Sequence, residues 1–467
     1  MIVAGILALL VSSAAPDTAA RAILDTAIAR MGGLAALTAV DRMRLEVMTE
    51  WQRTDFATDR PPVILSYELS TELRDYTIPA WRYSRRFFSP NGTSGVVDLV
   101  ADSVAAMELN GRWRPQNVAY VDERDEVFTF APERVLALAH QAADARALPD
   151  TLIDGTRYAR VTATVGKFRP TLHFRRTDGL LARASFRAAQ PSDFGLAPWG
   201  VMDVSITYSL WRKLPSSSLV LPMQLDVARV GRPYKRMTTI SLAVNPSIPA
   251  ESLTVNDSLR AAFLAASRKP MFDLPMDSAR IVDGGFALFG APGTPTGAVK
   301  VGGRWLLVEA GTAPLSIERS VAFLHRADSS AAIAGALITA PTGAGGVAWL
   351  ARERMSTWVT SSARPFAAAA LRGWSAPTTS IRPVTQNAWI RVGTDSVRVE
   401  TIDLPDFPGA SLVYVPALRW AYAFPAGPVQ LDYIRDRVRQ RGWRVDRIGS
   451  VRNFIGTPVT AASTANR

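Results

Sequence analysis

The chain of 467 residues contains no cysteine and only three histidines. The missing thiols exclude disulfides, thiolate metal sites and cysteine nucleophiles. His140, His173 and His325 lie in three unrelated segments, and an isolated histidine without a paired nucleophile is more often structural than catalytic. The sequence also lacks a Gly-x-Ser-x-Gly elbow, and Lys167 and Lys300 do not have the glycine spacing of a phosphate-binding loop.

Lysine is scarce, with five residues, whereas arginine and alanine are abundant. The formal net charge is +12, which suits anionic neighbours such as lipid head groups or acidic polymers. Basic residues nevertheless alternate with acidic ones over most of the chain, so coding bias explains this composition better than a binding function does. We predict no nucleic-acid partner.

Long apolar runs are missing after the first residues, and no later segment is long and apolar enough to span a bilayer. Residues 1–17 have a short apolar core followed by small residues, although no Lys or Arg precedes that core. This pattern predicts a signal peptide cleaved near Ala14 or Ala15, or a short anchor. We therefore expect a periplasmic or extracellular protein, with membrane association as an alternative.

Two domains are expected from the length and from a change of pattern along the chain. Residues 18–255 begin with a helical pattern and then alternate apolar and polar side chains in many short runs, which predicts an antiparallel sheet with a further helix over 132–148. Residues 256–277 hold a short helical run and a Pro-punctuated linker. Strands and helices alternate over 278–460, with one helix predicted over 315–327, and 461–467 form a tail. The predicted fold class is α+β.

The stretch GALITAPTGAGGVAWL, residues 335–350, is typical of a strand, a tight loop and the start of a helix. In α/β folds, ligands bind at the carboxyl ends of strands, so a functional site is expected at this loop. The loop offers only two hydroxyl groups, those of Thr339 and Thr342. A segment well placed for metal chemistry therefore lacks metal ligands.

Residues 278–460 resemble the metallo-β-lactamase fold family in the order of GGFALFG, VKVGGRWLLVEAG, the strand-loop-helix segment, LVYVPALRWAYAF and RIGSVRNFIGTP. The resemblance implies an αββα sandwich and a His-x-His-x-Asp-His set that binds two zinc ions. Counted back from Gly345, and then along the chain, the matching positions are Ile338, Ala340, Thr342, Gly343, Asp406, Phe424 or Pro425, and Ile455. Only Asp406 has a side chain that binds metals. The resemblance therefore implies a scaffold that has lost its zinc ligands and carries no cofactor.

Residues 18–255 resemble the lipoprotein-carrier (LolA-like) family in the order of PTLHFRRTDGLLARASF, GVMDVSITYSLWRKL, LVLPMQL and MTTISLAVN. Members of that family form a half-open antiparallel barrel with helices on its concave side and bind acyl chains in an apolar cavity. The resemblance implies a hydrophobic ligand for this part of the chain.

Three functions stay open at this point, and the first is favoured. It is a non-catalytic exported protein that binds a ligand or serves as an accessory subunit of a membrane-associated complex. The second is a metal-dependent hydrolase in which Glu309, at the end of the strand LLVEA, and Asp406 hold Mg²⁺ or Ca²⁺. The third is a carrier of a lipid or another hydrophobic ligand. The arginine-rich helix over 431–447 adds an anionic membrane surface as a partner, although a solvated face with ion pairs explains it more readily.

Overall fold

The structure is a computed structural model, and it describes most of the chain. The described residues are 17–52, 64–89, 92–116, 118–189, 201–215, 217–267, 276, 278–289, 297–311, 313–330, 332–377, 381–405, 407–424, 427–451 and 453–459. The predicted signal peptide or anchor, except for Asp17, lies outside these ranges, as do Asp406, Pro425 and the predicted tail. No helix within the described ranges is long and apolar enough to cross a bilayer.

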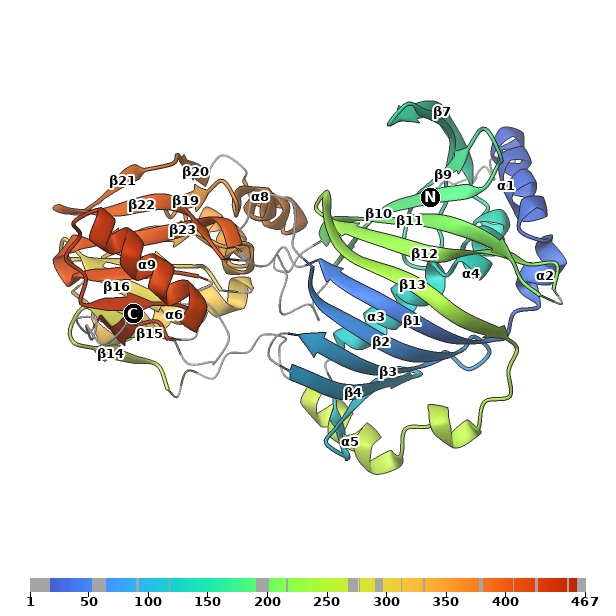
Figure 1. Cartoon of the computed structure of the whole chain (residues 1–467), viewed down its shortest axis with the longest axis horizontal. Coiled ribbons are helices and arrows are strands. Elements are labelled where there is room, and N and C mark those ends of the chain that lie inside the picture. Colours follow the sequence, from blue (N-terminus) through green and yellow to red (C-terminus); the bar gives the residue numbers. More distant parts are fainter. Residues whose placement is uncertain are drawn as a thin grey trace, which may run out of the picture. The chain divides into compact units, whose positions relative to one another are not determined.

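A 13-stranded sheet, called sheet A here, occupies the region between residues 42 and 244 (Figure 1). Its strands follow one another across the sheet in the order β6-β5-β4-β3-β2-β1-β13-β12-β11-β10-β9-β8-β7. They are β1 (Arg42–Gln52), β2 (Ile64–Asp75), β3 (Ala80–Ser89), β4 (Gly92–Ala101), β5 (Val104–Leu109), β6 (Arg112–Pro115), β7 (Arg146–Ile153), β8 (Thr156–Thr162), β9 (Thr171–Arg175), β10 (Leu181–Ala189), β11 (Val201–Lys213), β12 (Val220–Arg229) and β13 (Arg232–Val244). In the part of the sheet with the order β6-β5-β4-β3-β2-β1-β13, every pair of neighbouring strands is antiparallel.

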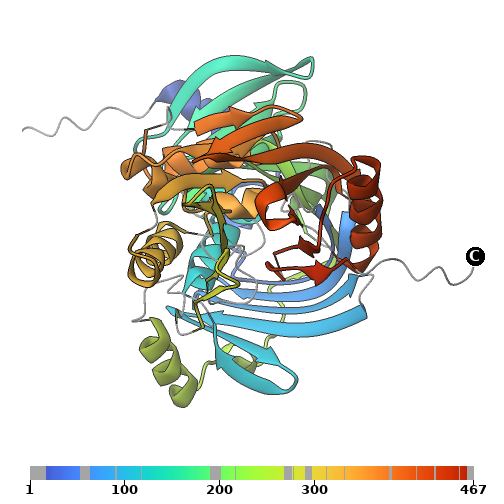
Figure 2. The same cartoon turned by 90° about the vertical axis from the view of Figure 1, so that its left-hand side faces the viewer.

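The alternation in β1 explains why such a segment becomes a strand with one buried face. Met43, Leu45, Val47 and Thr49 are buried at every second position, and the residues between them are more exposed. Since successive side chains of a strand point to opposite faces, this pattern fixes which face is covered. Figure 2 shows that the strands at the blue end of sheet A curve along their length.

Contacts within the chain define two compact units. The first consists of Met1–Asp41, Glu126–Phe186 and Ile206–Leu225, and the second of Arg42–Asp125, Arg187–Ser205 and Asp226–Arg467. The domain boundaries predicted at 255 and 278 stay predictions.

Helices line the first unit: α1 (Thr18–Arg30), α2 (Leu34–Thr38) and α4 (Pro132–Gln141). Asp17 caps α1 by accepting the backbone N–H groups of Ala19 and Ala20. The helix predicted over 132–148 is shorter in the structure, because the backbone is extended at Ala142 and β7 begins at Arg146. A second helix, α3 (Ala119–Thr129), was not predicted.

Two smaller sheets form the region after residue 278. Sheet C has the strand order β14-β15-β16-β17-β18-β19-β20 and sheet D the order β21-β22-β23-β24-β25-β26. Sheet C consists of β14 (Arg280–Val282), β15 (Phe286–Leu288), β16 (Gly297–Val301), β17 (Arg304–Val308), β18 (Ile333–Ile338), β19 (Thr357–Thr360) and β20 (Ile381–Val384). Sheet D consists of β21 (Ala388–Val392), β22 (Asp395–Leu404), β23 (Phe407–Val415), β24 (Trp420–Ala423), β25 (Arg447–Gly449) and β26 (Thr457–Pro458). The strands β17 to β20 are parallel, whereas β14 to β17 are antiparallel.

Four helices cover these two sheets: α6 (Pro314–Ala327), α7 (Val347–Arg352), α8 (Arg364–Gly373) and α9 (Pro428–Gln440), with short 3-10 turns at η2 (Pro341–Ala344) and η4 (Pro416–Leu418). The helix α5 (Asp257–Ser267) and the 3-10 turn η1 (Ala250–Leu253) instead contact strands of sheet A. The patterns in the sequence predicted α5, α6, α7 and α9, whereas α8 was not predicted.

Three hydrophobic cores lie between the layers of this region. One core lies between sheets C and D and includes Val299, Leu337, Val399 and Val413. A second joins the other face of sheet C to α6, α7 and α8, and a third joins the other face of sheet D to α9. Figure 2 shows α9, in red, along the outer side of its sheet. The region therefore has a helix-sheet-sheet-helix order of layers, and the α+β class predicted from the sequence is confirmed together with its large antiparallel sheet.

Candidate functional site

The loop after β18 has the strand, turn and helix that its sequence predicts, with η2 between β18 and α7. Backbone hydrogen bonds fix it to the end of β17: Ala310 N donates to Gly343 O at 2.7 Å, and Gly345 N donates to Gly311 O at 2.9 Å. The loop is therefore held closely against the residues that follow β17 and does not stand open above the sheet.

Glu309 provides the side-chain anchor of the same loop. Its carboxylate accepts the backbone N–H of Thr339 at 3.0 Å, the backbone N–H of Ala340 at 3.4 Å and the hydroxyl of Thr339. The side chain is fully buried, and burial raises the pKa of Glu309 to about 8 although these hydrogen bonds lower it. A carboxyl group with this pKa is largely protonated at neutral pH, which makes it a poor ligand for a hard cation.

Two further hydroxyl groups complete this buried polar cluster. Thr360 Oγ1 and Ser362 Oγ both donate to the carbonyl oxygen of Thr339, at 3.2 and 3.3 Å. Every polar group in the cluster therefore has a partner within the chain, as a stable buried network requires. The arrangement stabilises the loop and leaves Glu309 engaged with backbone donors.

The other positions matched to zinc ligands fall in apolar surroundings. Ile338 and Ala340 are fully buried in the cores on either side of sheet C. Ile455 packs against the core that contains Ala340 and Phe424, and Trp420 Nε1 donates to its carbonyl oxygen at 3.0 Å. Thr342 and Gly343 lie in η2, and Asp406 lies outside the described residues.

Within the described ranges, no group of three or more His, Cys, Asp or Glu side chains is close enough to hold a metal ion. The predicted hard-cation pair of Glu309 and Asp406 is not tested, because Asp406 is not described. The geometry of Glu309 is that of a structural acceptor.

The histidines lie on three separate elements. His140, on α4, has Nε2 at 3.0 Å from Asp25 Oδ1 on α1. His173 is buried on β9, where burial and then the charges of Arg183 and Arg160 lower its pKa to about 4. His325 belongs to the last turn of α6. The structural role that the sequence suggested for each of them stays a prediction.

Two arginines, one in the last turn of α9 and one at its C-cap, form ion pairs with the sheet that α9 covers. Arg437 and Arg441 bind the buried carboxylate of Glu400 on β22, the latter with Nη2 at 2.8 Å from Oε1. Two more, Arg435 and Arg439, form ion pairs with aspartates three residues earlier. The helix is thus mainly anchored and internally paired, which supports the solvated-face interpretation over a membrane-binding one.

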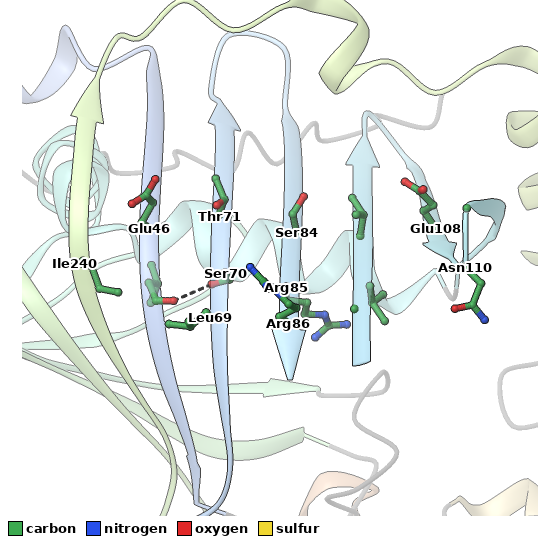
Figure 3. Close-up of a pocket in the computed structure, with 15 residues that line it drawn as sticks. Glu46, Leu69, Ser70, Thr71, Ser84, Arg85, Arg86, Glu108, Asn110 and Ile240 are labelled. Atoms are coloured by element: carbon green, nitrogen blue, oxygen red, sulfur yellow. Dashed lines mark hydrogen bonds between the residues drawn. The ribbon is translucent and has the colours of Figure 1, made fainter. Parts of the chain in front are cut away.

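Sheet A carries a groove with a volume of about 570 Å³ across β1 to β5. Figure 3 shows the side chains that line it. Glu46, Thr71, Ser84, Val97 and Glu108 form one row, since each is paired with the next across the sheet. The central positions have small side chains and the two ends have long ones, so the floor of the groove is low between two carboxylates.

A second row of the groove supplies apolar surface and one cation. Leu69 is paired with Arg86, and Arg86 with Gly95, whose missing side chain leaves space beside the guanidinium. Leu69 is 42% exposed and Ile240, which also lines the groove, is 59% exposed. Arg86 forms no ion pair among the described residues. The groove therefore combines exposed apolar side chains with charges of both signs, and its volume is typical of ligand sites.

The opposite face of the same strands carries a buried charge network. Arg85 Nη2 lies 2.6 Å from Asp98 Oδ2, and Arg85 Nη1 lies 4.0 Å from Glu68 Oε2. Tyr83 donates its hydroxyl to Glu68, and Trp51 Nε1 donates to the same carboxylate at 3.3 Å. Burial raises the pKa of Glu68 and of Asp98, against the opposing effect of Arg85. One cation between two carboxylates holds β2, β3 and β4 together.

Neither the groove nor the charge network was predicted from the sequence. The segment YELSTELRD alternates as a strand does, but alternation alone does not say whether Glu68 and Glu72 or Tyr67 and Leu69 face inward. Both acids are buried and both apolar residues are exposed. One feature of the sequence could have indicated the charge network: β2 carries acids and β3 carries Arg85, so opposite charges can pair between these strands.

No model of a protein family matches the chain, and no curated protein matches it. Among solved structures, a putative outer membrane lipoprotein-sorting protein domain from Vibrio parahaemolyticus is similar at 7% identity, over 50% of this chain and 95% of that one, with a TM-score of 0.31. The LolA superfamily protein NE2245 from Nitrosomonas europaea is similar at 10% identity, over 50% of this chain and 97% of that one, with a TM-score of 0.30. A metallo-β-lactamase from Pontibacter korlensis is similar at 12% identity, over 37% of this chain and 89% of that one, with a TM-score of 0.29. The chain thus resembles LolA-type domains and metallo-β-lactamases, the two families to which the sequence pointed.

Proposed function

We propose that the protein is an exported, non-catalytic binding protein. In this proposal the region after residue 278 is a metallo-β-lactamase-like sandwich that has lost its zinc ligands, and sheet A is a LolA-like domain that holds a hydrophobic or amphipathic ligand. The protein acts as a carrier of that ligand or as an accessory subunit of a membrane-associated complex. The location is periplasmic or extracellular.

The observation that carries the non-catalytic part is the closed loop after β18. The carboxylate of Glu309 accepts the backbone N–H groups of Thr339 and Ala340. The matched positions Ile338 and Ala340 carry alkyl groups that are buried in packed cores. Zinc requires imidazole, thiolate or carboxylate donors. The residues present in the loop supply none that is available, so they do not fit a zinc pair.

The observation that supports ligand binding is the groove on sheet A. Exposed apolar side chains that gather in one concave surface mark binding sites more often than single exposed ones do. Leu69, Val97 and Ile240 supply the apolar part, while Arg86 and the carboxylates of Glu46 and Glu108 supply polar contacts. An elongated amphipathic molecule, with apolar parts against Leu69 and Ile240 and polar groups towards the charged side chains, fits this lining.

The hydrolase alternative receives less support from the geometry. It needs Glu309 as an ionised ligand, whereas burial raises its pKa to about 8 and three donors surround it. Substituting Glu309 and Asp406 and measuring metal content is the direct comparison of the two hypotheses.

Binding of Nile red, a neutral apolar fluorophore, tests the groove. The full chain is expected to bind the dye saturably, and Leu69→Asp is expected to weaken binding by about tenfold, because burying one leucine contributes about 1.5–3 kcal/mol. Organic extracts of the purified protein, analysed by mass spectrometry, would identify a co-purifying acyl chain.

Leu152→Asp is the matched control, since Leu152 is 68% exposed on β7 and does not line the groove. It should leave dye binding unchanged. Equal loss in both variants, or no saturable binding by the unsubstituted protein, would refute the groove as the site.

A further inference from the structure

A second cavity lies at the edge of sheet C opposite to the closed loop. Its volume is about 550 Å³, and residues from the end of α7, the turn before β19, the segment after α8 and the start of β20 line it. Because β18, β19 and β20 are parallel, the start of β19 and the loop after β18 lie at opposite edges of the sheet. The cavity is therefore separate from the positions matched to zinc ligands.

Three of the seven lining residues are arginines: Arg352, Arg354 and Arg382. The other four are Ala351, Met355, Ser356 and Pro377, so no carboxylate lines the cavity among the residues that the structure describes. The neighbouring acid Glu353 is exposed and is not part of the lining. A cavity with three positive charges and no negative one attracts anions.

Two of the three guanidinium groups are held in place by contacts, and none of the three forms an ion pair among the described residues. Arg352 Nη2 donates to the carbonyl oxygen of Trp374 at 2.7 Å, which holds the side chain in place and uses only part of its donor set. Arg382 lies over the ring of Trp358, with its guanidinium carbon 5.9 Å from the ring centre. Arg354 makes no ion pair among the residues that the structure describes.

The backbone at the end of α7 does not compete for the remaining donors. The last carbonyl groups of α7 already accept backbone N–H groups, since Trp349 O, Leu350 O and Ala351 O bind Glu353 N, Met355 N and Arg354 N. The helix end is thus satisfied without the arginines. Several guanidinium N–H groups and the hydroxyl of Ser356 therefore have no partner among the described residues and are available to a ligand.

We propose that this cavity binds the phosphate or sulfate group of an anionic ligand. Arginine presents a planar fork of donors that matches two oxygens of such a group, and three arginines suit a group with more than one negative charge. The same chemistry occurs in a free phosphorylated metabolite and in the head group of an anionic lipid. The site is independent of the groove on sheet A and of the function proposed above.

Calorimetric titration of the full chain with inorganic pyrophosphate tests the site. We expect saturable binding that weakens as salt is added. Arg382→Glu and Arg354→Gly should each weaken it by about tenfold or more, because a charge-assisted hydrogen bond contributes about 1.5–3 kcal/mol. The glycine variant also keeps the test clear of misfolding, because Arg354 has a φ of 55°, a conformation that glycine favours.

Arg391→Glu is the matched control for charge, since Arg391 is exposed on β21 and lies outside the cavity lining. It should bind pyrophosphate as the unsubstituted protein does. Absence of pyrophosphate binding, or an equal loss in the Arg391 variant, would overturn the proposal.

Vesicles distinguish the two sources of the anionic group. Co-sedimentation with phosphatidylglycerol vesicles but not with phosphatidylcholine vesicles, lost in the Arg382 variant, would identify a lipid head group. Pyrophosphate binding without vesicle binding would identify a free phosphorylated molecule. Both outcomes support the anion site.

Discussion

A Cβ atom added to Gly343 would lie 1.9 Å from Oε2 and 2.8 Å from Cβ of Glu309. No side chain at position 343 is therefore compatible with the present position of Glu309, and part of the overlap involves an atom that cannot swing away. Gly343 is one of the positions matched to a zinc ligand. In this arrangement of the loop, a metal-binding side chain at 343 and the anchor at 309 exclude each other.

Gly343→Ala should destabilise the protein by about 1–3 kcal/mol, because the added methyl group overpacks a filled site. Urea denaturation gives the free energy of unfolding. Gly95→Ala is the control, since its nearest neighbours would be 3.8 and 3.9 Å from the added Cβ, and it should change stability by about 0.5 kcal/mol or less. If the two variants were equally stable, the close contact between Gly343 and Glu309 would be wrong.

Glu309 makes the stability of the protein depend on pH. Its pKa is about 8 in the folded protein, against 4.5 for a glutamate exposed to water. Between these values the folded state holds a proton that the unfolded state has lost, so the contribution of Glu309 is fully present below about pH 4.5 and is lost as pH rises towards 8. Glu309→Gln should remove this dependence.

The measurement is the free energy of unfolding of both proteins at several pH values. The glutamine variant should gain stability relative to the unsubstituted protein as pH rises from 5 to about 8.5. A difference between the two proteins that stays constant over this range would contradict the raised pKa.

Arg85 and Arg86 are adjacent on β3 but face opposite sides of sheet A. Arg85→Met leaves Asp98 and Glu68 buried without their cation, which should cost about 3–5 kcal/mol of stability. Arg86→Met removes an exposed side chain without an ion pair among the described residues, so it should change stability by about 0.5 kcal/mol or less. Thermal and urea unfolding of the two variants measure the contrast, and similar losses would contradict the buried network.

Arg354 occupies a left-handed conformation directly after the end of α7, with φ 55°. Arg354→Gly should leave stability unchanged or raise it by up to about 1 kcal/mol, because glycine avoids the strain of a Cβ in this region. Arg352→Gly, two residues earlier and within the helix, should lower stability by about 1 kcal/mol. A clear loss in the Arg354 variant would mean that its side chain has a structural role.

Local patterns were sufficient to predict many elements of the fold. The alternation in β1 and the apolar run of β18 followed by proline and glycines led to the correct strand and strand-loop-helix segments. The helices α6 and α9 have periodic apolar residues and were predicted as well. In contrast, α3 has many charged residues and little apolar period, so its pattern did not indicate a helix. The helix α8 does have an apolar face, with Phe366, Ala370 and Leu371 buried, and the prediction overlooked it.

The functional surfaces depended on strand register, which the sequence does not state. The row from Glu46 to Glu108 becomes a groove only because five strands align these positions, although the five residues are distant in the sequence. The role of Glu309 likewise depends on parallel pairing of β17 with β18, which brings Thr339 to its carboxylate. Its place at the end of a strand made Glu309 a candidate site residue in the sequence. The strand pairing explains how its carboxylate reaches the loop after β18.

The most direct test of a closed, metal-free loop is elemental analysis of the purified full chain after incubation with Zn²⁺, Mn²⁺, Mg²⁺ and Ca²⁺ and removal of free ions. The account predicts metal far below one ion per chain, with no change in Glu309→Gln. One or more ions per chain, lost when Glu309 or Asp406 is substituted, would contradict it and establish a metal centre at this loop.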